Sequence, residues 1–153
     1  MTGAKKNTEE REILTREGEV TGWRAEVWAH NFTFGEKTRL LEEYQKAPER
    51  DARPSINVLG TFTKDVKGVS QFDFWVMPGK PDLGKAEILS VGAILKAKPV
   101  LEAHVTLSEI EYLTVLALAT TGHLRYLSCH FQTPRYGKAL ISSLTFGSHK
   151  PKE

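Results

Sequence analysis

The sequence predicts an α+β protein that is mostly β: an antiparallel β-sandwich or open barrel of about seven or eight strands, with one buried helix. Runs in which apolar and polar residues alternate recur at short spacing along most of the chain, as is typical of half-buried strands. One segment, residues 109–120, instead combines a helix-capping sequence with almost uninterrupted apolar residues. A parallel α/β fold would need several such helices.

The length and composition are those of one ordinary globular domain. The chain has 153 residues, of which 40% are hydrophobic and 26% are charged. A chain of this size can bury a core without a disulfide or a structural metal. We expect a flexible arm over residues 1–10, one β-rich domain over residues 11–147 and a flexible tail over residues 148–153.

The sequence shows no sign of a membrane or secreted protein. It has no stretch of about 18 apolar residues, and its first residues lack the apolar core of a secretory signal. Cys129 is the only cysteine, which excludes an internal disulfide and indicates a reducing compartment. We therefore expect a cytoplasmic location, no membrane contact, and Cys129 as a small core residue rather than a nucleophile.

The first expected strands are followed by an irregular segment. Glu17-Gly18 is typical of a hairpin turn, and residues 20–34 alternate as one long strand. Residues 35–54 break this alternation, carry an apolar stripe of the spacing found on a short helix, and contain two prolines. We interpret them as a connection rather than a domain boundary.

The middle of the chain predicts a hairpin and two further strands. Residues 56–62 and 72–76 alternate on either side of a glycine-containing turn at residues 65–68. Residues 88–95 are apolar on both faces, as expected of a covered central strand. Residues 100–107 show the clearest alternation in the chain.

The helix is predicted from its caps as well as from its composition. Ser108 and Glu111 have the spacing of a capping box, and Gly122 suits the left-handed conformation that often ends a helix. Because the helix is apolar nearly all round, we expect it to be covered on most sides, and exposure of Leu113 would instead indicate an interface element. The predicted buried core includes Phe72, Phe74, Leu101, Val105, Ile110, Leu113 and Leu116.

The last predicted hairpin, residues 123–132 and 138–146, carries the basic end of the chain. Five basic side chains and one acidic side chain lie beyond residue 120, whereas the rest of the chain has an acidic excess. The turn at residues 133–137 and the residue after it supply two basic side chains that can neutralise phosphates and a tyrosine that can stack on a base. The candidate ligand-binding residues, expected to form one positive patch, are Arg125, Arg135, Tyr136 and Lys138.

Histidines offer a second candidate site. His104 and Glu102 share the polar face of one strand and are expected to be accessible, while His123 and Arg125 share a face of a later strand. If the two strands are neighbours, His104, His123 and Glu102 become candidate catalytic residues for general acid–base chemistry. The alternative is an ordinary polar sheet face in contact with water.

No motif in the chain points to a cofactor or a metal ion. The sequence contains no GxGxxG, Walker, HExxH or GxSxG motif and no pair of cysteines. We therefore predict a non-catalytic binding or protein-interaction module, with a protein partner or self-association and no cofactor. Two alternatives stay open: an anion or nucleic-acid binder that uses the C-terminal hairpin, and a small enzyme that uses His104 and His123.

Overall fold

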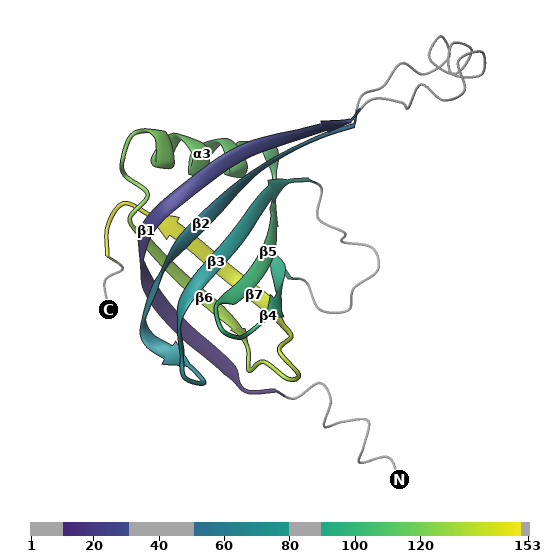
Figure 1. Cartoon of the computed structure of the whole chain (residues 1–153). Helices are drawn as coiled ribbons and strands as arrows, with labels where there is room; N and C mark the ends of the chain where they lie inside the picture. The colour runs from purple at the N-terminus through teal and green to yellow at the C-terminus, as the bar shows by residue number, and fades with distance from the viewer. Residues whose placement is uncertain (1–10, 31–50, 80–89, 151–153) are drawn as a thin grey trace, which may run out of the picture.

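The computed structural model describes residues 11–30, 51–79 and 90–150, and Figure 1 shows their arrangement. Residues 1–10, residues 151–153 of the predicted tail (148–153) and residues 35–50 of the predicted connection (35–54) lie outside this part of the chain. Residues 51–54, predicted as the end of that connection, instead begin a strand. The elements are β1 (Ile13–His30), β2 (Asp51–Val66), β3 (Val69–Pro78), β4 (Gly92–Lys96), β5 (Leu101–Leu107), α3 (Glu109–Thr120), β6 (Tyr126–Gln132) and β7 (Ala139–Gly147).

The strands close into a barrel in the order β1-β2-β3-β5-β4-β7-β6. Pairing of residues 13–19 of β1 with β6 closes the ring, and β3 and β5 form its one parallel pair among the described strands. The prediction of a mostly β protein with one helix is confirmed. The sheet closes on itself instead of forming an open barrel, and the β3–β5 pair is parallel because β4 lies on the far side of β5.

β1 is longer at its start than the sequence indicates. Gly18 lies inside the strand and is no hairpin turn, which corrects the interpretation of Glu17-Gly18. A Cβ at Gly18 would lie 2.7 Å from the ring of Phe72, so this glycine provides space for an aromatic side chain. Gly60 has the same role, since its Cβ would lie 2.3 Å from that ring. A β-bulge between Val20 and Gly22 then bends the strand away from β6.

Beyond this bulge, β1 and β2 continue together as a two-stranded arm. The arm comprises residues 22–30 of β1 and residues 51–59 of β2, whose register runs from Gly22 opposite Leu59 to His30 opposite Asp51. Figure 1 shows its outer half leaving the barrel at the upper right. The arm is therefore a projection that only one further strand, β3, borders, and only over part of its length.

The core lies inside the barrel and is built around aromatic rings. Phe72, Phe74, Leu101 and Val105 are buried, as predicted. The ring centroid of Phe72 lies 4.9 Å from that of Phe62 and 5.5 Å from that of Phe74, the second pair meeting edge to face. Such edge-to-face contacts add to the burial of apolar area.

The helix α3 is half-exposed, which corrects the prediction that it is buried. Leu113 is 50% exposed, Ile110 is 74% exposed, and Leu116 is only half-buried. The side of α3 that meets the barrel carries Tyr112 and Val115. A helix that is apolar nearly all round contains no information about which side faces the core, and only one side of this helix packs on the barrel. No helix in the described ranges is long and apolar enough to span a membrane.

The predicted capping box is present at the start of α3. The Ser108 amide donates to Glu111 Oε1 at 2.8 Å, and the Glu111 amide donates to Ser108 Oγ at 3.3 Å. The hydrogen bond from the Ser108 backbone lowers the pKa of Glu111 below its ordinary value. These bonds satisfy amides that the helix itself leaves without partners.

We expect Ser108→Ala to lower the free energy of unfolding by about 1 kcal/mol, because one end of α3 loses its side-chain acceptor. Urea unfolding followed by circular dichroism measures this difference. Ser108→Thr is the control and is expected to retain most of the stability, since threonine is also a good N-cap. Equal losses in the two variants would contradict a capping role for the hydroxyl.

Candidate anion-binding site

Two hairpin turns of the same type meet at the end of the barrel opposite α3. Lys67-Gly68 connects β2 to β3, and Tyr136-Gly137 lies between the bridged residues Arg135 and Lys138. All four turn residues have φ between 51° and 87°. Two successive residues with positive φ define the type I′ turn, whose twist matches that of the flanking strands.

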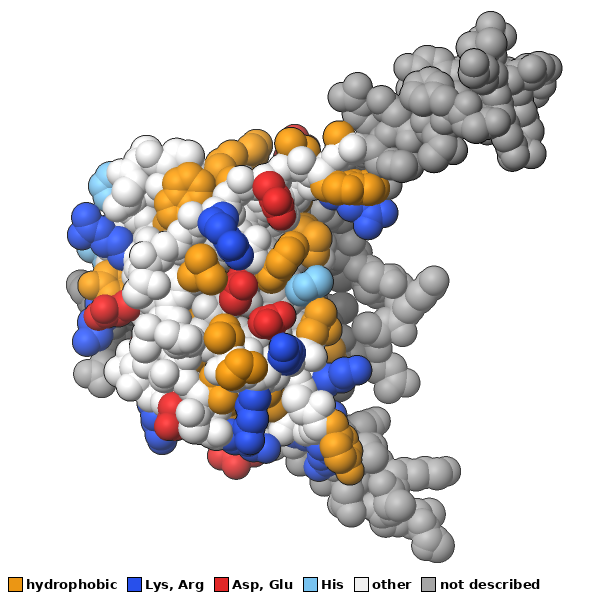
Figure 2. All heavy atoms as spheres, in the orientation of Figure 1, with side chains coloured by type: hydrophobic (Ala, Val, Ile, Leu, Met, Phe, Trp, Pro, Cys, Tyr) orange, Lys and Arg blue, Asp and Glu red, His pale blue; other side chains and the backbone are white. Residues whose placement is uncertain are grey.

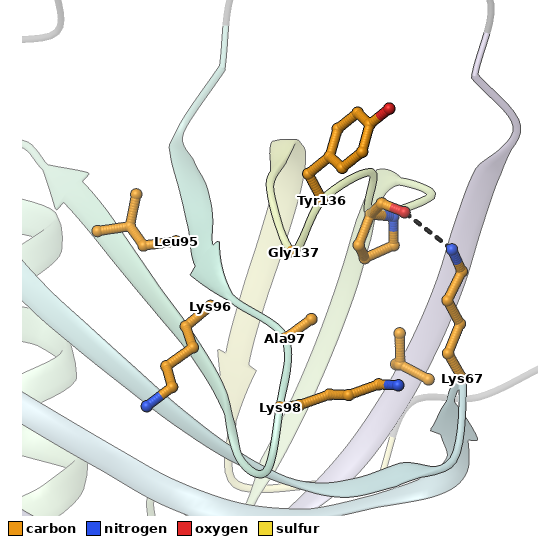
Figure 3. Close-up of a pocket in the computed structure, with 9 residues that line it drawn as sticks. Lys67, Leu95, Lys96, Ala97, Lys98, Tyr136 and Gly137 are labelled. Carbon is orange, nitrogen blue, oxygen red and sulfur yellow. Dashed lines mark hydrogen bonds between the residues drawn. The ribbon is translucent and has the colours of Figure 1, made fainter.

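Hydrogen bonds to backbone carbonyls hold two cations beside these turns. Lys67 Nζ donates to the carbonyl of Pro134 at 2.9 Å and so ties the two turns together (Figure 3). Arg11 Nη1 donates to the carbonyl of Lys138 at 2.8 Å. Carbonyl groups are neutral, so these bonds position the cations without compensating their charge.

Two adjoining cavities share Lys67, Pro134 and Tyr136 in their walls. The first, of about 450 Å³, is also lined by Lys96 at the end of β4 and by Lys98 of the β4–β5 turn. In Figure 3 Lys98 extends toward the hairpin that carries Lys67, while the tail of Lys96 points away from it. The second, of about 390 Å³, is also lined by Arg11, Glu12, Thr133 and Arg135. Tyr136 therefore stands between two basic hollows.

The charge that the described residues place around Tyr136 is predominantly positive. Glu12 is the only acidic residue among the described residues that line the two cavities. None of the lining cations forms an ion pair with a described carboxylate, and the Nε of Arg11 is buried with no hydrogen-bond partner among the described residues. Figure 2 shows several Lys and Arg side chains, with fewer Asp and Glu side chains, at the lower end of the barrel. Gathered cations without counter-charges repel one another and attract anions.

Tyr136 has neither the burial nor the backbone conformation that would explain a tyrosine at this position. Its side chain is 97% exposed, and its backbone has a φ of 54°, where a residue with a Cβ is strained by about 1 kcal/mol or more. Asn, Asp and Gly are the residues that favour this position of a type I′ turn. A residue that neither stabilises the turn nor packs in the core is a candidate for ligand contact.

The structure brings together three of the four predicted ligand-binding residues. Arg135, Tyr136 and Lys138 lie at this end, whereas Arg125 precedes β6 at the other end of that strand, where its amide donates to the carbonyl of Gly147. Sequence reasoning missed Arg11, Lys67, Lys96 and Lys98, which also line the site. The only signals for them were the two lysines on either side of Ala97 and the Lys67-Gly68 turn.

The histidine candidates do not come together: His104 lies on β5, whereas His123 lies before β6 and on no strand, which corrects the prediction that it shares a strand face with Arg125. β5, with Glu102 and His104, pairs with β3 and β4, whereas β6 pairs with β1 and β7. His104 stacks on Trp75 at a centroid distance of 5.7 Å, and His123 Nδ1 lies 3.0 Å from Thr121 Oγ1. The hypothesis of a catalytic site required the segments that carry His104 and His123 to be neighbouring strands, and they are not. In the described ranges, no three His, Cys, Asp or Glu side chains are close enough to hold a metal ion.

Comparison of the chain with known protein families, with curated proteins and with solved structures finds no match.

Proposed function

We propose that this protein is a non-catalytic binding module that binds single-stranded nucleic acid at the barrel end around Tyr136. The observation that carries the proposal is the exposed Tyr136 ring in a strained turn, with basic side chains in the cavities on both of its sides. Single strands are bound without sequence preference when bases stack on aromatic rings and cations follow the phosphates.

The arrangement favours a single strand over a duplex or a small anion. A base stacks on Tyr136 only where it is not already stacked within a helix, and the face of the tyrosine ring is of use to a base but not to a simple phosphate. The cations lie on either side of the ring, with Lys98 in one cavity and Arg11 and Arg135 in the other. A strand that crosses the ring then has phosphates near both groups.

A cytoplasmic location is part of the same proposal. Cys129 is free and buried, so the described fold uses no disulfide, and this agrees with a reducing compartment. Nucleic acid is abundant there. Fractionation of cells that express the full chain tests the location.

We expect Tyr136→Asn to weaken binding of a labelled single-stranded oligonucleotide by roughly 5- to 150-fold, the effect of losing one stacked base. The same change is expected to leave stability equal or higher, because asparagine tolerates positive φ in this turn. Fluorescence anisotropy at low salt measures the affinity, and urea unfolding measures the stability. Tyr136→Phe keeps the ring and is expected to keep the affinity.

Arg135→Ala and Arg125→Ala form a matched pair for the location of the site. Both remove one arginine next to β6, but from opposite ends of that strand. We expect only Arg135→Ala to weaken binding and to flatten the dependence of affinity on salt, because it removes a phosphate contact and the counterion release that goes with it. Equal effects of the two variants, or no binding at low salt, would contradict the proposal.

A further inference from the structure

The arm has a strand edge that the barrel does not use. Residues 22–27 of β1 pair with β2 on one side, and Thr21 lies in the bulge before them. On the other side the pairing of β1 with β6 ends at Glu19, and the Val20 amide then donates to the carbonyl of Arg125 at 2.8 Å. Beyond this point no described strand lies against residues 21–27 on that side. Such an edge has backbone N–H and C=O groups free to pair with another strand.

The side chains along this edge protect it only in part. Proteins guard a sheet edge with charged side chains, proline, a bulge or a very short strand. Residues 21–27 contain no lysine or proline, and their two charged side chains, Arg24 and Glu26, have opposite signs. Val27 is 65% exposed and Trp23 is 38% exposed. Both lie on the side of the arm that continues the barrel interior, because Trp23 pairs with the buried Val58. Figure 2 shows hydrophobic side chains along the upper edge of the molecule, where the arm runs.

We propose that this edge pairs with the same edge of a second copy of the chain, antiparallel and centred on Ala25. In that register Arg24 lies opposite Glu26 of the second copy on the outer face, and Glu26 lies opposite its Arg24. On the inner face Trp23 lies opposite Val27, an aromatic and β-branched pair that stabilises antiparallel sheets. The edge is therefore complementary to itself in charge and in shape.

The neighbouring registers are less favourable for a clear electrostatic reason. A two-fold axis perpendicular to the sheet keeps inner side chains opposite inner ones. The residue on which the pairing is centred can therefore change only in steps of one residue along the strand. Centring on Arg24 places two arginines opposite each other, and centring on Glu26 places two glutamates opposite each other. Like charges directly opposite destabilise a sheet. Of these three registers, only the one centred on Ala25 avoids like charges directly opposite each other and pairs Arg24 with Glu26.

The exposed side of α3 adds to the apolar surface around the arm. Val27 pairs with Pro54, which lines a cavity of about 630 Å³ together with Pro78, Tyr112 and Leu113. The half-exposed helix and the arm therefore border one apolar hollow. Self-association near the arm agrees with the large exposure of this helix, and it is independent of nucleic-acid binding at the opposite end of the barrel.

Charge reversal tests the register in the full chain, freed of nucleic acid. We expect sedimentation velocity to show a concentration-dependent dimer, and either Arg24→Glu or Glu26→Arg to weaken it by roughly tenfold, because each creates two like-charge pairs. The double variant R24E/E26R restores opposite charges and is expected to regain the original affinity. Both residues are exposed, so the fold is expected to survive, which circular dichroism verifies.

A cysteine at the symmetry axis gives an independent test. Ala25→Cys places two thiols opposite each other, within the range that a cross-strand disulfide spans. We expect mild oxidation to link the chains, whereas Ser70→Cys, an exposed position on β3, is expected to stay largely unlinked; the native Cys129 is buried and does not compete. A monomer at every concentration, or a dimer that is unaffected by both single charge reversals, would overturn the proposal.

Discussion

Phe72→Ala is expected to lower the free energy of unfolding by about 3–5 kcal/mol, the usual effect of removing a buried phenylalanine ring. The ring is fully enclosed and contacts Phe62 and Phe74. The strands beside it carry glycines at positions 18 and 60, where a Cβ would collide with the ring. A barrel built so closely around one side chain cannot collapse to fill the space it leaves.

Urea unfolding monitored by tryptophan fluorescence measures this effect through the midpoint of the transition. Gln71→Ala is the matched control, because Gln71 is the preceding residue on β3 and its side chain is exposed. We expect the control to change stability by no more than about 0.5 kcal/mol. A loss below about 1.5 kcal/mol for Phe72→Ala would mean that the ring is not the centre of the core.

Stability is expected to fall steeply above pH 9 because of Cys129. Burial raises the pKa of its thiol from 9.0 to about 12, with a smaller opposing effect from Arg16. Between these two values the unfolded chain releases the thiol proton and the folded chain retains it. The unfolded state is then favoured by about 1.4 kcal/mol per pH unit, and this effect ends as the pH passes the folded pKa.

Cys129→Ala isolates this contribution from the lysines and tyrosines that titrate in the same range. The free energy of unfolding, measured from pH 8 to pH 11, is expected to decline more for the native chain than for the variant, by roughly 2–3 kcal/mol over that interval. The comparison uses slopes, so the cavity left by the substitution does not affect it. Parallel curves would show that the folded thiol titrates normally.

The elements that could be predicted from the sequence are those whose causes are local. Ser108 and Glu111 lie three positions apart and need no distant partner to cap α3. Gly18 could not be assigned in this way. A Glu-Gly pair is the same whether it turns the chain or makes room for Phe72, and only the register between β1, β2 and β3 distinguishes the two. The parallel pairing of β3 with β5 is equally invisible in the alternation of either strand.

In the candidate site, too, the residues that are close in sequence could be predicted and those brought together by the fold could not. Arg135, Tyr136 and Lys138 stand together in the chain, so the sequence could group them. Arg11 and Lys67 reach the same place from the residues before β1 and from the β2–β3 turn, through hydrogen bonds to the carbonyls of Lys138 and Pro134. Counting charge by segment assigned Arg125 to the site because it is near in sequence, although the length of β6 separates it from the others.

The pairing of β1 with β6, the seam that closes the barrel, governs when this protein can fold during its synthesis. Thr15 and His130, whose side chains meet across the seam at 2.8 Å, are 115 positions apart. At a translation rate of about 5–20 residues per second, the second emerges from the ribosome roughly 6–23 s after the first. The β1–β2–β3 sheet can assemble in that interval, but its β1 edge waits for β6. A nascent chain interrupted anywhere before Tyr126 therefore leaves the ribosome with the barrel open.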